Sequence, residues 1–263
     1  MGVKILIKLC LFVLICCDLC SPVEASKLSI GYQRPESDRF REIFRALKSN
    51  HESIYGESVK YLKSIYNWPD KIEVVVSTCG FVNSRYLPND KLIVICYESL
   101  YQKVYDYPEK AKSKEAFERR VFQNVMFTLW HELGHALMDQ FGIGQGTDVK
   151  QTELLADEFA ALSMLWRSDA HWNNILMISA LHFKSQSLKN PNKNYKVHAS
   201  DDFRYEKIIV LLYGFAQKSY SKLKSEVNQL NWLSISAQEY YLERSVFWEQ
   251  NLREHTRGDF FNN

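Results

Sequence analysis

Hydrophobic residues recur along this chain with the period of helices, and the longest such stretch lies near its centre. From about 115 to 141, apolar side chains follow one another at steps of three and four residues, as they do along one face of an amphipathic helix. The set comprises Val121, Phe122, Val125, Met126, Leu129, Leu133 and Leu137. Gly142 comes next and favours the left-handed conformation that ends many helices. The pattern predicts one long helix ending near Phe141.

The same pattern predicts further helices and one pair of strands. Helices are expected at about 37–66, 170–184, 201–224 and 236–253, and another begins at Asp148, which has the capping-box spacing to Gln151. Two apolar runs, 72–76 and 91–96, flank a turn at 87–90 and predict an antiparallel hairpin. The polar stretch 185–196 contains Asn-Pro-Asn and predicts a loop. The expected fold class is α+β, predominantly helical, with a small hairpin packed on the long helix.

Candidate chemistry lies inside the long helix, in the segment His131-Glu132-Leu133-Gly134-His135. Histidines four residues apart share one face of a helix, so both imidazoles can reach one metal ion. Glu132 can lie beside the ion without binding it, ready to take a proton from an attacking water. This is the arrangement of zinc metalloproteases. Gly134 allows another backbone or a substrate to approach closely.

A third ligand is expected from the next helix. Glu153 and Asp157 are four residues apart and therefore share a helix face. We expect Glu153 to complete a two-histidine, one-glutamate zinc set and Asp157 to orient a ligating histidine. Glu158 is an alternative ligand, although it projects about 100° away from Asp157. The metzincin extension is excluded, because Met138 and Phe141 occupy its glycine and histidine positions.

Several blocks, in order, resemble a family of "putative metallopeptidases" described as a domain of unknown function and related to gluzincins. Its strand-turn-strand segment is matched by Cys79-Gly80, Asn83, Tyr86 and 93–98. Its metal centre is matched by 131–139 with 153–160, and its downstream motif by His198, Asp201, Arg204, Tyr213 and Gly214. A weaker similarity covers Glu239, Tyr240 and Trp248, with Ala237 where the family usually has cysteine. The resemblance implies a zincin-like fold and peptidase activity, and it names no substrate.

Zinc peptidases also need a donor that stabilises the developing oxyanion. His198 is the first candidate for this catalytic role, with Tyr205 or Arg204 as substitutes. In the alternative interpretation, His198 and Asp201 only cap a helix, and Arg204 pairs with a carboxylate such as Asp157. The sequence leaves the two interpretations open.

Composition limits the class of partner. The 263 residues carry a net charge of +2, and lysine and arginine are dispersed along the chain. Nothing in this distribution calls for nucleic acid or an anionic membrane. The hydrophobic fraction of 46% is enough for one globular domain with a substantial core. We therefore expect a single domain over 26–263.

The N-terminus has the form of a secretory signal. Lys4 and Lys8 precede an apolar run at 9–17, and a small-residue cleavage site falls near Ala25-Ser26. The run is too short for a comfortable membrane span, although a retained anchor stays possible. Of the six cysteines, only Cys79 and Cys96 follow this segment. We expect them to form a disulfide across the hairpin, with two free thiols as the alternative. The mature protein would be secreted, periplasmic or extracellular.

The sequence therefore predicts a secreted zinc metallopeptidase that acts on peptide or protein substrates with one Zn²⁺ ion. By analogy with zincins, the strand near 93–96 would offer an edge to an extended peptide. Two other functions remain open at this point. One is a zinc-dependent amidase on a non-peptide amide, and the other is a secreted binding protein with a vestigial metal site.

Overall fold

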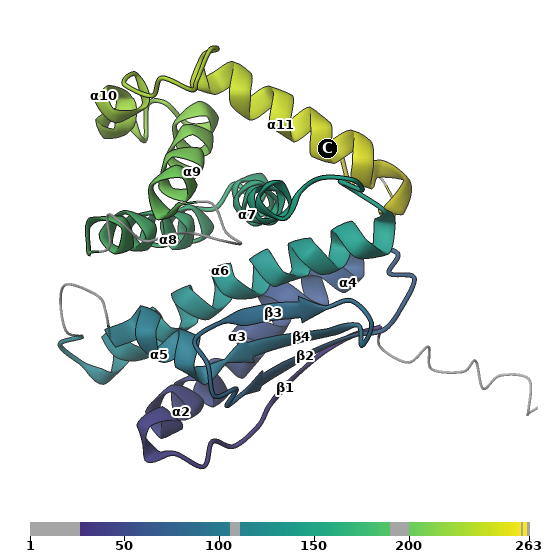
Figure 1. The fold of residues 1–263 in the computed structure, drawn as a ribbon, viewed down its shortest axis with the longest axis vertical. Helices are drawn as coiled ribbons and strands as arrows, with labels where there is room; N and C mark the ends of the chain where they lie inside the picture. Colours follow the sequence, from purple (N-terminus) through teal and green to yellow (C-terminus); the bar gives the residue numbers. More distant parts are fainter. Residues whose placement is uncertain (1–26, 106–110, 190–199, 259, 262–263) are drawn as a thin grey trace, which may run out of the picture.

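The computed structural model describes residues 27–105, 111–189, 200–258 and 260–261. The long helix α6 (Lys114–Phe141) runs through the middle of the molecule, between the sheet and the later helices (Figure 1). Ser113 caps its start by accepting a hydrogen bond from the Ala116 backbone, and Gly142 ends it with φ of 69°. Every residue from Val121 to Gly134 is buried, so α6 is enclosed on all sides in this stretch. The amphipathic helix predicted from the sequence is therefore a central helix, because elements pack on both of its sides.

Four short strands form one mixed sheet. They are β1 (Leu28–Tyr32), β2 (Ile72–Ser77), β3 (Ser84–Leu87) and β4 (Leu92–Cys96), in the order β1-β2-β4-β3. β1, β2 and β4 are parallel, and only β3 and β4 are antiparallel. The antiparallel hairpin predicted between 72–76 and 91–96 is thus wrong. The predicted turn instead connects β3 to β4, and β1 and β3 were not predicted.

The strand sequences explain why the predicted strand pairing was wrong. The β4 sequence Leu-Ile-Val-Ile-Cys is a continuous apolar run, which is typical of an inner strand buried on both faces. β3 has the sequence Ser-Arg-Tyr-Leu, in which a hydrophobic signal is hard to find. Because β4 lies between β2 and β3, residues 93–96 are not the edge predicted to hold a peptide. That edge is β3.

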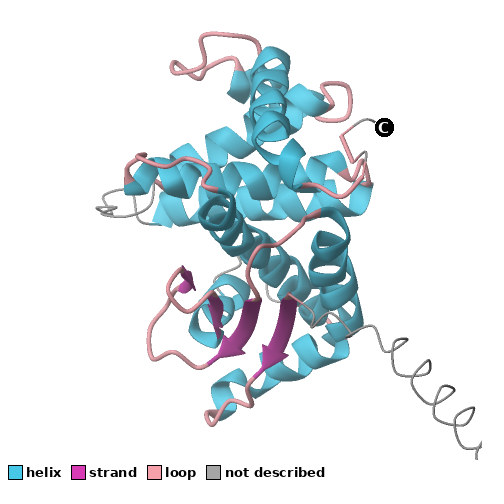
Figure 2. Cartoon of the chain, turned by 90° about the vertical axis from the view of Figure 1, so that its right-hand side faces the viewer, coloured by secondary structure: helices cyan, strands magenta, loops and turns pink. Residues whose placement is uncertain are grey.

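The remaining elements are helices. The predicted helical region 37–66 is confirmed as η1 (Asp38–Phe40), α2 (Arg41–Ser49), α3 (His51–Ile54), η2 (Tyr55–Lys60) and α4 (Tyr61–Ile65). α5 (Tyr97–Tyr105) follows β4 directly and was not predicted. The second half contains α7 (Val149–Trp166), α8 (Ala170–Lys189), α9 (Asp201–Phe215), η3 (Ser221–Leu223), α10 (Lys224–Val227), α11 (Ala237–Leu252) and η4 (Arg253–His255). Seen from the side, the strands occupy the lower part of the molecule and these helices fill the upper part (Figure 2).

Two predicted boundaries in the second half were wrong. α8 continues through 185–189, which had been predicted as loop, because Ser187 on this turn is still buried. The rest of that predicted loop lies outside the described residues. α9 ends at Phe215 rather than near 224, and α11 crosses it close to Gly214. The predicted start at Asp148 is confirmed, since its carboxylate accepts a hydrogen bond from the Gln151 backbone at 2.8 Å.

Two glycines let helices approach each other closely. A Cβ atom at Gly134 would lie 3.2 Å from the backbone of Ala156, so α6 and α7 nearly touch at the metal-binding segment. A Cβ atom at Gly214 would lie 2.1 Å from the carbonyl oxygen of Ala237, at the crossing of α9 and α11. Because the atom in the way at Gly214 belongs to the backbone, α9 and α11 would have to move apart to accommodate any side chain there.

We therefore expect Gly214→Ala to lower the free energy of unfolding by about 3 kcal/mol or more, as severe overpacking does. Urea denaturation of the purified protein would measure this. Gly31→Ala is a suitable control, because a Cβ atom there meets nothing within 4 Å and the unfolding free energy should change little. Equal stabilities of the two variants would show that α9 and α11 are not held this closely.

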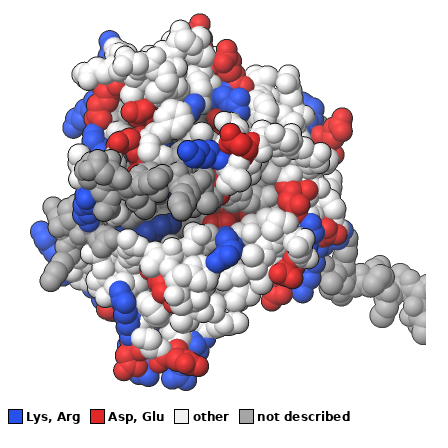
Figure 3. Space-filling view, in the orientation of Figure 1, with Lys and Arg blue, Asp and Glu red and all other residues white. Residues whose placement is uncertain are grey.

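Two features of the structure can be compared with the prediction that the protein is secreted: its disulfide and its surface. Cys79, just after β2, is bonded to Cys96 at the end of β4, so the predicted pair forms between neighbouring parallel strands. Among the described residues, no helix is long and apolar enough to cross a membrane. Blue and red side chains are interspersed over the face in Figure 3, as the dispersed charges suggested. The predicted signal segment, 1–25, lies outside the described residues.

Candidate metal centre

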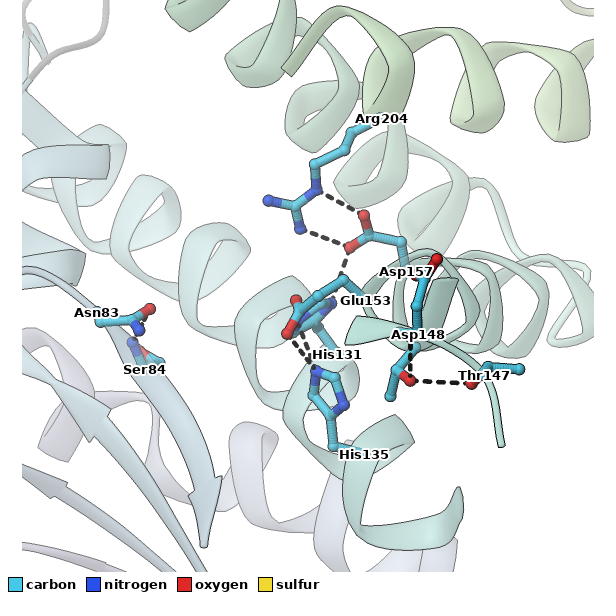
Figure 4. Close-up of polar contacts among 10 residues, drawn as sticks. Asn83, Ser84, His131, His135, Thr147, Asp148, Glu153, Asp157 and Arg204 are labelled. Carbon is cyan, nitrogen blue, oxygen red and sulfur yellow. Dashed lines mark hydrogen bonds and ion pairs between the residues drawn. The ribbon is translucent and has the colours of Figure 1, made fainter. Parts of the chain in front are cut away.

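Two neighbouring helices bring the predicted ligands together (Figure 4). His131 and His135 lie one turn apart on α6, with their Nε2 atoms 3.2 Å from each other. Glu153 on α7 faces them, with carboxylate oxygens 3.2 Å from His131 Nε2 and 3.4 Å from His135 Nε2. His131 is buried, and His135 and Glu153 are largely so. One donor atom from each residue therefore points at a common position.

These distances fit a bound zinc ion. Ligand bonds of 2.0–2.1 Å in a tetrahedral site place neighbouring ligand atoms about 3.3 Å apart. The three separations are of that order, 3.2–3.4 Å, although His131 and His135 face different oxygens of the Glu153 carboxylate. The donors are two imidazoles and one carboxylate, the set found in catalytic zinc sites that keep a fourth position for water. The described residues thus suit the ion that the sequence predicted.

Asp157 fixes the orientation of His131. Its carboxylate lies 2.8 Å from His131 Nδ1, which leaves Nε2 to face the metal position. Arg204 on α9 donates to the same carboxylate from two nitrogens, each at 2.6 Å. Burial would raise the pKa of Asp157, but Arg204 and His131 outweigh burial and hold it well below its usual range. Asp157 therefore remains ionised and accepts from both neighbours.

The charges around His131 favour a cation at this position. Burial alone would lower the pKa of His131, yet the nearby carboxylates of Asp157, Glu153 and Glu132 raise it to about 9. In the metal-free protein these carboxylates stabilise a proton on the imidazole. A metal ion would replace that proton, since only the neutral imidazole binds a metal.

Glu132 lies where two cavities meet. The large cavity, of about 500 Å³, is lined by His131, Glu132, His135 and Glu153 together with Tyr86, Met138, Ile143 and Val149. The small cavity, of about 160 Å³, is lined by His131, Glu132 and Arg204 together with Lys103, Thr128, His182 and Asp201. Asn83 and Ser84, next to and within β3, line both. The carboxylate of Glu132 accepts no hydrogen bond from any described residue, so it is free to take a proton.

The other predicted site residues lie elsewhere. Glu158 accepts hydrogen bonds from Arg244 and Trp248 of α11, each at 2.8 Å, so it faces away from the metal position and the alternative ligand is wrong. Tyr205 donates to Glu226 at 2.7 Å and lines neither cavity, which excludes it as an oxyanion donor. His198 lies outside the described residues, so its catalytic role stays a prediction. The substitute Arg204 does line the small cavity while it pairs with Asp157.

Sequence reasoning missed two residues of the small cavity. Lys103 reaches it from α5, which was not predicted, and His182 reaches it from α8. No motif or spacing marks either residue. Burial and the neighbouring cations Lys103, Arg204 and Lys189 lower the pKa of His182 to about 3, so its imidazole is neutral at neutral pH.

From the lowered pKa of His182 we predict how the free energy of unfolding changes with pH. His182 takes up a proton near pH 6.5 when the protein unfolds but only near pH 3 when it is folded. Stability should therefore fall as the pH drops below 6.5, by about 2 kcal/mol between pH 7 and pH 5 from this group alone. In His182→Gln that part of the loss should disappear, as measured by urea denaturation at both pH values. Leu181→Gln, at the exposed neighbouring position, should keep the wild-type loss.

Comparison with known proteins supports the chemistry of this centre. A family model described as "Putative metallopeptidase" matches residues 32–252, which include both metal-binding helices and Arg204. No curated protein and no solved structure matches the chain. The family model covers most of the chain, well beyond the metal-binding segment. The chain therefore belongs to this family of putative metallopeptidases.

Proposed function

We propose that this protein is a secreted zinc metallopeptidase with a zincin-like fold. The observation that carries the proposal is the convergence of His131, His135 and Glu153, whose donor atoms lie within 4.8 Å of one another and are of the types that bind catalytic zinc. Family membership supports peptide hydrolysis. The disulfide between Cys79 and Cys96 and the predicted signal segment support an oxidising location outside the cytoplasm.

The residues around the metal position have distinct roles in this proposal. Zinc, when bound, would polarise the scissile carbonyl and make water a better nucleophile. Glu132 takes the proton of the attacking water and passes it to the leaving nitrogen. Asp157 holds His131 in place, and Arg204 holds Asp157. The outer edge of β3 is free of other described strands and could hydrogen-bond an extended peptide along the two cavities.

Metal analysis tests the centre directly. The protein from residue 26 onward should contain one zinc per chain and cleave a denatured protein or a peptide library. A chelator should abolish cleavage, and added zinc should restore it. His131→Ala should lose both the zinc and the activity, because it removes one of three ligands. Absence of stoichiometric zinc in the wild-type protein would overturn the proposal.

The same assay separates the two alternatives raised by the sequence. Stoichiometric zinc with cleavage of small amides but not of peptides would indicate an amidase. Stoichiometric zinc without any hydrolysis would indicate a binding protein.

A further inference from the structure

The small cavity is lined by Lys103, whose ammonium pairs with no carboxylate among the described residues. Lys103 Nζ donates to Thr128 Oγ1 at 2.5 Å, and the Thr128 hydroxyl in turn donates to the Asn124 carbonyl at 2.9 Å. Lys103 forms no ion pair with any residue in the described part of the chain. An ammonium has three protons to donate, so this contact leaves donors available to a ligand in the cavity.

Neither of the two carboxylates whose charges act on Lys103, Asp157 and Glu132, forms an ion pair with it in the described part of the chain. Asp157 accepts from Arg204 and His131. Asp201, which also lines the small cavity, contributes to the raised pKa of Arg204. Glu132 lies beside the metal ligands, where the proposed mechanism needs it to accept a proton. These charges act on Lys103 only at a distance.

Burial of Lys103 has an energetic cost that a ligand could offset. Burial, followed by the charge of Arg204, lowers the pKa of Lys103 to about 8, although Glu132 and Asp157 act in the opposite direction. The group still carries its charge at neutral pH. Judged by its exposed surface, Lys103 is partly buried, so its charge has lost part of its contact with water without gaining a close partner of opposite charge. A carboxylate is the group that would satisfy it best.

The position of the cavity connects this charge with the metal centre. The small cavity shares Asn83, Ser84, His131 and Glu132 with the large one, so the two adjoin at the metal ligand His131 and the proposed base Glu132. Its volume of about 160 Å³ suits a short side chain rather than a large ring system. Its lining is mixed: Ser99, Gln102 and Gln186 join the charged residues, and Val82, Phe127 and Phe183 supply an apolar part.

We propose that the small cavity is a specificity subsite for a carboxylate next to the cleaved bond, and that Lys103 is the residue that recognises it. The proposal rests on the proposed peptidase function and adds the substrate class. The carboxylate could belong to a glutamate or aspartate side chain or to the C-terminus of a peptide. Both sources present the same group to the ammonium.

Matched peptides distinguish the two sources. In a cleaved reference peptide, the residue on each side of the scissile bond is set in turn to Glu or Gln, with both ends blocked. A second pair has a free or an amidated C-terminus next to the bond and no acidic side chain. In one of these pairs, kcat/KM should be at least about tenfold higher for the carboxylate form, as expected for a charge-assisted hydrogen bond.

Variants of Lys103 then test the residue. The preference should fall to near unity in Lys103→Met, persist in part in Lys103→Arg and reverse in favour of Gln in Lys103→Glu. Lys60→Met should keep the wild-type preference, because Lys60 is exposed and lines neither cavity. Zinc content and circular dichroism establish that each variant is folded. A wild-type ratio near unity in both peptide pairs would overturn the proposal, whatever the variants do.

A binding measurement separates this proposal from the proposed function. Calorimetry with zinc-loaded Glu132→Gln protein measures peptide affinity without turnover. Suppose that wild type cleaves no peptide, but that the carboxylate peptide binds at least tenfold more tightly than its amide counterpart, and does so only when Lys103 is present. In that case the subsite stands and the peptidase function fails. If peptides are cleaved without any carboxylate preference, the function stands and the subsite fails.

Discussion

Glu132→Gln should retain zinc while losing about 10²–10⁴-fold in kcat, the contribution typical of a general acid–base group. The amide has nearly the same shape as the carboxylate but cannot take the proton of the attacking water. The side chain is buried at the junction of the two cavities and accepts no hydrogen bond from the described residues. Its replacement therefore leaves no neighbouring donor unpaired, and the fold should be unaffected.

The measurement compares zinc content, unfolding free energy and peptide turnover in the two proteins. Glu158→Gln is an informative control, because it alters a glutamate on α7 that contacts α11 instead of the metal position. It should affect stability more than turnover. If Glu132→Gln cleaves as fast as wild type, Glu132 is not the base, and another group must take the proton.

Asp157→Ala should lower both stability and zinc affinity. It removes the partner of two buried groups, His131 and Arg204, and leaves the guanidinium without its paired carboxylate. Breaking a buried ion pair in this way costs about 3–5 kcal/mol of unfolding free energy. Loss of the residue that orients a ligating histidine should weaken metal binding about 10–100-fold. Chemical denaturation and competition with a zinc chelator measure the two effects separately.

A double variant distinguishes the two roles of Asp157. Asp157→Ala combined with Arg204→Met removes both charges, so part of the lost stability should return, because no buried charge remains unpaired. Zinc affinity should stay low, because His131 still lacks its acceptor. If the single variant loses less than about 1 kcal/mol and binds zinc as wild type does, the buried pair does not have the role assigned to it.

The parts of the fold that follow a local pattern were predictable. α6 and the start of α7 could be placed because helix period and capping depend on residues within a few positions of one another. The turn before β4 followed from Pro88, Asn89 and Asp90 in the same way. Strand pairing was not predictable. The order β1-β2-β4-β3 brings together segments far apart in the chain, and the polar strand β3 gave no local signal.

In the candidate site, too, the residues that a local spacing brings together were predictable, and those that only the fold brings together were not. His131, Glu132 and His135 are recognisable because one helix turn places them together. Glu153 and Asp157 are recognisable because they have the same four-residue spacing on the next helix. The contact of Arg204 with Asp157 spans 47 positions, and the sequence only suggested it as one alternative. Lys103 and His182 belong to no motif at all, and the fold alone brings them next to Glu132.

The sequence by itself determined the candidate metal ligands, the helices that carry them and the family to which the chain belongs. These properties depend on the spacing of residues a few positions apart, which can be read from the sequence without knowing the fold. Only the tertiary structure decided that β3 and not β4 is an edge strand, that Glu158 faces away from the metal position, and that Lys103 lines the same cavity as the proposed base. Those features depend on long-range packing, in which burial and charge are set by residues distant in the chain.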